Sequence, residues 1–176
     1  VFFLFFIGII VCFNIIYFFM IEQIYTYFTL EIIYLWLNIG IIPFWLTLIF
    51  FPNSNISKMF ITSIFPITLL SIVYGYLTYI LFKNDFNFLG NFNLYLGLDE
   101  LIDLFKDSSF LILFWIHFLA VNLFCGGWIV KDYQKYNINK ILVFFPLIIT
   151  YFVGPLGIFT YWLIRIFYAK KISLYD

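Results

Sequence analysis

The feature that most constrains this chain is a series of apolar runs, each about as long as a bilayer is thick. A hydrocarbon core of about 30 Å needs roughly 20 residues of α-helix at 1.5 Å per residue. The charged residues gather between the runs, as the cost of placing charge in hydrocarbon requires. The pattern predicts an all-α integral membrane protein with five spans: 1–20, 32–51, 59–82, 108–130 and 138–167.

Composition supports the membrane assignment and excludes several function classes. Hydrophobic residues make up 65% of the chain and charged residues 10%, against roughly 45–50% and 25% in soluble domains. Nine Lys and Arg balance nine Asp and Glu, so no basic surface indicates nucleic-acid binding. Both cysteines lie in apolar runs without a second ligand at metal-binding spacing, and no metal site is predicted.

One short segment has the pattern of a helix lying in the membrane surface. In "LDELIDLF", Leu98, Leu101, Ile102 and Phe105 follow i, i+3, i+4, i+7 spacing, and acidic residues occupy the other side. This periodicity predicts an interfacial amphipathic helix at about 98–106.

The five spans leave the orientation undecided. They place Lys58, Lys131, Lys135 and Lys140 on one side of the membrane. The other side receives Lys83, Lys106, Arg165, Lys170 and Lys171. That split is too even for the positive-inside rule to choose between them.

Several polar residues fall at similar depth inside the predicted spans. Counting 1.5 Å per residue predicts a polar layer of Asn14, Asn38 and His117, with Gly154-Pro155 somewhat deeper and Tyr161 shallower. Pro155 has no amide hydrogen, so the carbonyl of Tyr151 loses its usual partner. Glu31 and Arg165 fall near one membrane surface and are predicted to form an ion pair.

His117, the only histidine, is the sole candidate for a catalytic residue. A neutral imidazole can bind a ligand or move a proton, but it can equally make a structural hydrogen bond between helices, and the structural interpretation is favoured. Haem binding lacks a second axial ligand at that depth, and Ser/His/Asp catalysis lacks a buried acid.

The order of several motifs resembles the membrane family of the plant abscisic-acid-deficient-four protein. The resemblance covers about residues 30–168 and rests on five stretches: "LWLNIGIIPFWLTLIFFPNS" (35–54), "FPITLLSIVYGYL" (65–77), "LDELIDLF" (98–105), "WIHFLAVNLFCGGWIVKD" (115–132) and "GPLGIFTYWLIR" (154–165). It implies a four-helix membrane domain over 32–168, to which 1–31 adds a transmembrane helix and connector and 169–176 a polar tail. Plant members of the family are implicated in making the xanthophyll neoxanthin.

The resemblance also points to particular residues. Family positions match Trp115, His117, Ala120, Leu123, Phe124, Asp132, Gly154, Pro155 and Gly157. Trp115 and Asn122 accordingly join the predicted polar layer. Asn122 stands where the family usually has Asp, and an amide cannot act as a general base.

Two functions follow as hypotheses. In the first, the chain is a structural accessory subunit of a larger organellar complex, respiratory in our preference, without a cofactor of its own. It would contact other membrane subunits through its first helix and lipid-facing aromatic side chains, and it would bind phospholipid. In the second, it handles a carotenoid or isoprenoid, with His117 in the binding layer. The composition favours a mitochondrial inner membrane over a plastid one, and a bacterial plasma membrane stays open.

Overall fold

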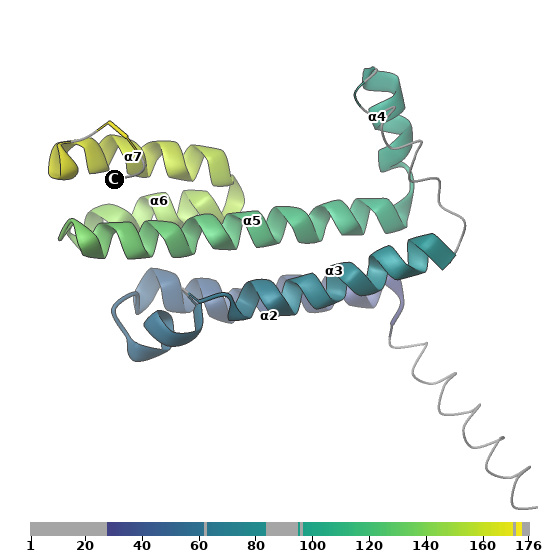
Figure 1. Ribbon diagram of the computed structural model, residues 1–176, viewed down its shortest axis with the longest axis horizontal. Helices are drawn as coiled ribbons and strands as arrows, with labels where there is room; N and C mark the ends of the chain where they lie inside the picture. The colour runs from purple at the N-terminus through teal and green to yellow at the C-terminus, as the bar shows by residue number, and fades with distance from the viewer. Residues whose placement is uncertain (1–27, 62, 84–94, 96, 171, 174–176) are drawn as a thin grey trace, which may run out of the picture. The chain divides into compact units, whose positions relative to one another are not determined.

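The computed structural model describes residues 28–61, 63–83, 95, 97–170 and 172–173 (Figure 1). The chain consists of two compact units, residues 1–37 and 38–176. The predicted first span, 1–20, lies outside the described residues. All regular structure in the described part is helical, without strands.

Three helices within the described residues are long and apolar enough to cross a membrane: α2 (Leu30–Phe50), α3 (Phe65–Lys83) and α5 (Ser108–Lys135). They correspond to the second, third and fourth predicted spans. A π-helical turn, η1 (Ser57–Ile61), precedes α3, which therefore begins later than predicted. In the first unit, the described residues include the start of α2, where the Thr29 hydroxyl accepts a hydrogen bond from the Ile32 amide at 3.4 Å.

The amphipathic segment forms α4 (Leu98–Phe105), as its periodicity predicts. Asp107 follows it and begins α5, because its carboxylate accepts a hydrogen bond from the Phe110 amide at 2.8 Å and so caps the helix. The Phe105 ring lies 4.9 Å from the Phe114 ring, measured between centroids. These contacts place α4 against the first turns of α5.

The last predicted span, 138–167, is wrong as a single helix. The chain forms α6 (Lys140–Phe152) and α7 (Gly154–Ala169), which meet at Val153. Pro155 causes the break, because its ring would clash with the Tyr151 carbonyl one turn earlier and it has no amide to bond there. At 13 and 16 residues, the helices are about 20 and 24 Å long, short of a bilayer core.

α6 and α7 instead fold back on each other as a helical hairpin that packs on α5 (Figure 1). Gly157 makes the close approach possible, since a Cβ there would lie 2.5 Å from the Cα of Thr150. Where α2 meets α5, Gly126 leaves room for the buried Trp45 ring, 2.7 Å from an added Cβ. Small residues therefore set both approaches, as is usual between membrane helices.

Gly157→Ala should destabilise the hairpin by about 1–3 kcal/mol, because the added methyl overlaps the Thr150 backbone. Gly75→Ala in α3 is the matched control, since nothing lies within 4 Å of a Cβ at Gly75. We expect the control to be neutral or slightly stabilising. Unfolding of the purified chain in mild detergent measures both, and equal effects would contradict the packing described.

Candidate functional site

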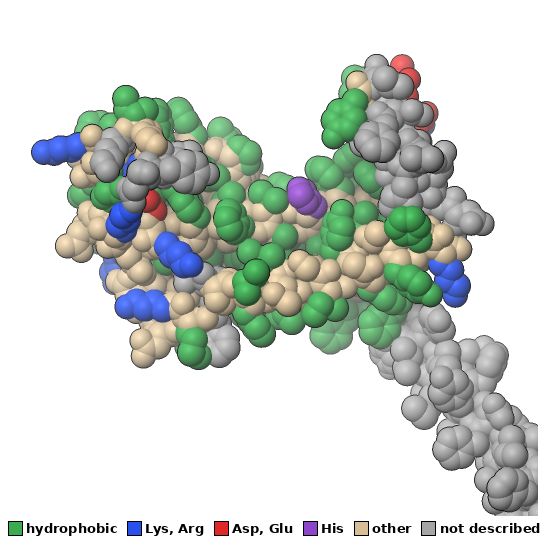
Figure 2. Space-filling model, in the orientation of Figure 1, with side chains coloured by type: hydrophobic (Ala, Val, Ile, Leu, Met, Phe, Trp, Pro, Cys, Tyr) green, Lys and Arg blue, Asp and Glu red, His purple; other side chains and the backbone are tan. Residues whose placement is uncertain are grey.

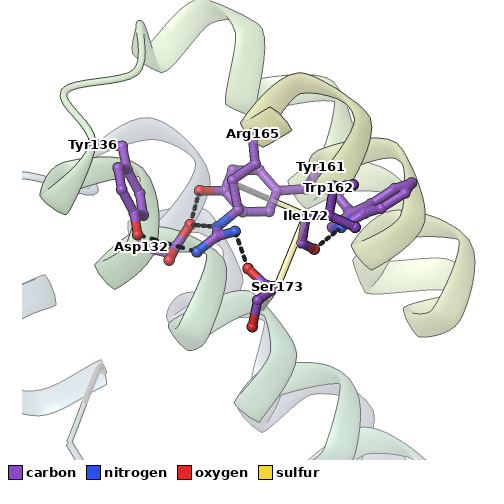
Figure 3. A network of polar contacts seen from close by, with 7 residues as sticks. All are labelled: Asp132, Tyr136, Tyr161, Trp162, Arg165, Ile172 and Ser173. Carbon is purple, nitrogen blue, oxygen red and sulfur yellow. Dashed lines mark hydrogen bonds and ion pairs between the residues drawn. The ribbon is translucent and has the colours of Figure 1, made fainter. Parts of the chain in front are cut away.

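A cluster of buried, hydrogen-bonded polar side chains lies where the ends of α5 and α7 meet (Figure 3). Asp132 and Tyr136 are four residues apart on α5, and Tyr161 and Arg165 are four apart on α7. Residues at i and i+4 share one helix face, so each helix presents two polar groups to the other. We call these four residues the Asp132 cluster.

A single carboxylate oxygen joins the two helices. The Tyr161 hydroxyl donates to Asp132 Oδ2 at 2.6 Å, and Arg165 Nε donates to the same oxygen at 2.7 Å. All three side chains are buried, with exposed fractions of 0% for Tyr161, 1% for Arg165 and 9% for Asp132. Charge-assisted hydrogen bonds of this length are among the strongest in proteins.

The rest of the guanidinium is also bound. One terminal nitrogen of Arg165 donates to the Ser173 carbonyl at 2.6 Å, and the other to the Tyr136 hydroxyl at 3.3 Å. The tail reaches this position because Lys170 adopts a left-handed conformation (φ 53°) that ends α7. The Trp162 indole donates to the Ile172 carbonyl at 2.9 Å and holds the tail there.

The arrangement is suited to holding helices together. Its charges cancel, and Asp132 Oδ2 already accepts two hydrogen bonds. Burying an ion pair is costly unless its hydrogen bonds are satisfied, and here tyrosine hydroxyls and a backbone carbonyl satisfy them. The predicted partner of Arg165 was Glu31, which belongs to the other unit, and that ion pair stays a prediction.

The predicted polar layer is distributed over separate contacts. The Trp115 indole donates to the Asn38 side-chain oxygen at 3.3 Å and links α5 to α2. Tyr161 belongs to the Asp132 cluster, and Pro155 lies exposed in the first turn of α7.

Asn122 occupies the point where the hairpin reverses. It is buried, and its amide donates to the Tyr151 carbonyl at 3.4 Å. This is the carbonyl that Pro155 leaves without an amide partner. Gly154 lies directly against the Asn122 side-chain oxygen, where a Cβ would overlap. A carboxylate could not donate this bond, so an amide at position 122 fits the break in the helix.

His117 does not bridge helices in the described part of the chain. Its side chain is exposed and has no hydrogen-bond partner among the described residues. Figure 2 shows the histidine in a hollow between the α6–α7 hairpin and α4. The hairpin is too short to cover this part of α5, and the interhelical hydrogen bond of His117 stays a prediction.

His117 is also far from the buried carboxylate. Fifteen residues of one helix separate it from Asp132, which corresponds to about 22 Å. An acid–base pair needs hydrogen-bond reach, so the two cannot act together. Within the described ranges, no group of three His, Cys, Asp or Glu side chains could hold a metal ion.

Sequence reasoning missed the Asp132 cluster. The spans placed Arg165 and Asp132 on opposite sides of the membrane, and Asp132 entered only as a family position. The two i, i+4 pairs are visible in the sequence. They become informative once Gly154-Pro155 is interpreted as a chain reversal that returns Arg165 to the end of α5.

Asp132→Asn should destabilise the protein by about 3–5 kcal/mol, because it leaves the Arg165 charge buried without a counter-charge. The same substitution at Asp103 is the control. Asp103 pairs with Lys106 at 2.6 Å, but the side chains are 72% and 70% exposed, and such surface pairs contribute about 0.2–1 kcal/mol. Unfolding titrations in mixed detergent measure both variants, and similar losses would contradict a supporting role for Asp132.

Comparison with known proteins agrees with the resemblance noted in the sequence. The family model described as ABA DEFICIENT 4-like matches residues 32–161, which include all but the first two residues of α2, then α3 to α6 and the first half of α7. No curated protein and no solved structure gave a significant match. Since the match covers most of this membrane protein's length, the chain belongs to the ABA DEFICIENT 4-like family.

Proposed function

We propose that the chain is a non-catalytic accessory subunit of a larger membrane complex. The observation that carries the proposal is the hydroxyl of Tyr74, which has no hydrogen-bond partner among the described residues. Tyr74 is at the midpoint of α3, and its side chain is 38% exposed.

The depth of Tyr74 favours a hydrogen-bond partner outside the described residues. Nine residues separate it from each end of α3, so it lies about 13 Å from either membrane surface. Water is absent at that depth, and an unpaired hydroxyl in hydrocarbon costs several kcal/mol. A neighbouring subunit with an acceptor would remove this cost, whereas lipid tails would not.

The outer side of α3 offers the matching surface. Only Pro66, Leu77 and Leu81 of its 19 residues are buried. A stripe of large exposed side chains at i, i+3, i+7, i+10 spacing lies on the face of α3 opposite Tyr74: Leu69, Ile72, Tyr76 and Tyr79. Ser71 and Phe82 are exposed and lie within about 80° of Tyr74 around the helix. Aromatic residues are enriched in protein interfaces, and this side of α3 would be the contact surface.

The uses of the other polar groups support a structural role. Asn38, Asn122, Asp132 and Arg165 each have a partner on another helix, as side chains that hold helices together would. We place the complex in an organellar inner membrane, with mitochondrial respiratory complexes as the first assemblies to examine. The 27 Phe residues indicate the AT-rich coding that is common in organellar genomes.

Tyr74→Phe should weaken the attachment of the chain to its complex, because the hydroxyl that would bond the partner subunit is lost. The substitution keeps the aromatic ring, so the apolar contact is unchanged. We expect wild-type protein, extracted in mild detergent, to migrate on a native gel with a large assembly, and the variant to shift toward the free chain. Tyr168→Phe is the control, since Tyr168 is exposed at the end of α7, where water can reach it. Migration of the wild type as a free chain would overturn the proposal.

A second candidate function is binding of a carotenoid or other isoprenoid with a polar end group. It rests on the exposed His117 in the hollow beside α5 (Figure 2) and on membership of a family whose plant members we associate with neoxanthin. The imidazole would hydrogen-bond a hydroxyl of the ligand, while apolar side chains of α5 would contact the polyene.

His117→Leu should abolish this binding while keeping the apolar surface. The purified protein would be incubated with zeaxanthin, which has hydroxyl end groups, and with β-carotene, which has none. The second candidate predicts that only zeaxanthin co-elutes with the wild type, with a shifted absorption spectrum, and that the variant retains neither. Equal retention of both pigments by both proteins would exclude a role for His117.

A further inference from the structure

The hairpin returns the chain to the end of α5 from which it starts. Arg165 near the end of α7 pairs with Asp132 near the end of α5, and Ser173 lies beside them. The α2–α3 turn is at the same end, because the Tyr133 hydroxyl donates to the Asn53 side chain at 2.8 Å. Gln134 donates to the Pro52 carbonyl at 3.0 Å. The α2–α3 turn, the α5–α6 turn and the tail after α7 therefore lie at one end of α5.

Charge is distributed very unevenly between the two ends of α5. The end just described has five exposed lysines: Lys58, Lys131, Lys135, Lys140 and Lys170. Of the described carboxylates, only Asp132 is there, and Arg165 neutralises it. We call this surface the basic end.

The opposite end of α5 is acidic. It has four exposed carboxylates, of Asp99, Glu100, Asp103 and Asp107, and two described lysines, of which Lys106 is bound to Asp103. Figure 2 shows this separation, with blue side chains gathered beside the ends of α5 and α7 and red ones on α4.

We propose that the basic end faces the cytoplasmic side of the membrane, or the matrix or stromal side in an organelle, and binds anionic phospholipid headgroups there. Lysine-rich short loops face that side, and anionic lipids in that leaflet attract juxtamembrane lysines. The five spans predicted from the sequence divide the same Lys and Arg residues almost evenly between the two sides of the membrane. The hairpin moves Arg165 and Lys170 to the side of Lys140 and creates the asymmetry.

Labelling of single cysteines tests the orientation. Asn55→Cys in the α2–α3 turn, Ser173→Cys in the tail and Glu100→Cys in α4 would each be introduced into full-length protein with Cys12 and Cys125 replaced by Ser. The host is a bacterial inner membrane. A membrane-impermeant maleimide should label Glu100→Cys in intact cells, and the other two only after permeabilisation. Labelling of Ser173→Cys together with Glu100→Cys would show that α7 ends on the opposite side and overturn the proposal.

A binding measurement tests the lipid. Purified protein in detergent would be titrated with phosphatidylglycerol, with phosphatidylcholine as the neutral lipid and glycerol phosphate as the soluble anion. We expect binding of phosphatidylglycerol alone, weakened about 5-fold for each lysine removed in Lys131→Gln and Lys140→Gln. Lys83→Gln and Lys106→Gln at the other end should leave it unchanged.

Equal binding of phosphatidylglycerol and phosphatidylcholine would overturn the lipid assignment. So would glycerol phosphate binding as tightly as the lipid, since a soluble anion would then be the ligand. Neither result depends on whether the chain joins a complex, so the lipid assignment can fail while the subunit proposal stands, and the reverse.

Discussion

The ion pair between Asp132 and Arg165 holds the C-terminal half of the molecule together. Neither charge is tolerated alone in an apolar interior, so each requires the other at hydrogen-bond distance, which fixes α7 against α5 at a single register. Tyr161 adds a second bond to the same oxygen, and the tail covers the guanidinium. The hairpin is therefore anchored at its open end by charge and at its closed end by Asn122.

The Asp132–Arg165 ion pair and the Asn122 hydrogen bond stabilise opposite ends of the hairpin. Pro155 forces the helix to stop, which frees the carbonyl of Tyr151, and Asn122 donates the hydrogen bond that compensates it. Gly154 and Gly157 leave the room that this reversal requires. An otherwise continuous apolar segment becomes two helices, and the Tyr151 carbonyl exposed by the break has a partner within the bundle.

Much of the secondary structure could be predicted from the sequence. The spans corresponding to α2, α3 and α5 follow from run length, and α4 follows from the spacing of Leu98, Leu101, Ile102 and Phe105. Hydropathy could not reveal the hairpin, because two short apolar helices and one long one have the same composition. Gly154-Pro155 was recognised as polar-layer chemistry, although its main effect is on the direction of the chain.

The candidate site was less predictable for the same reason. Asp132 and Arg165 are 33 residues apart, and their contact depends on the reversal between them. His117 was expected to make a hydrogen bond between helices, and its side chain is exposed on the part of α5 that α6 and α7 do not reach. Trp115 and Asn38 do meet, because both lie on helices whose extent was predicted correctly.

The hairpin also bears on how the protein is made. A helix that crossed the bilayer after Lys140 would have to carry Arg165 and Lys170 through hydrocarbon during synthesis. A hairpin enters from the side on which both of its ends remain, so these cations never leave water until Arg165 meets Asp132. Helices α6 and α7 can thus insert after α5 is in place, with no translocation step of their own.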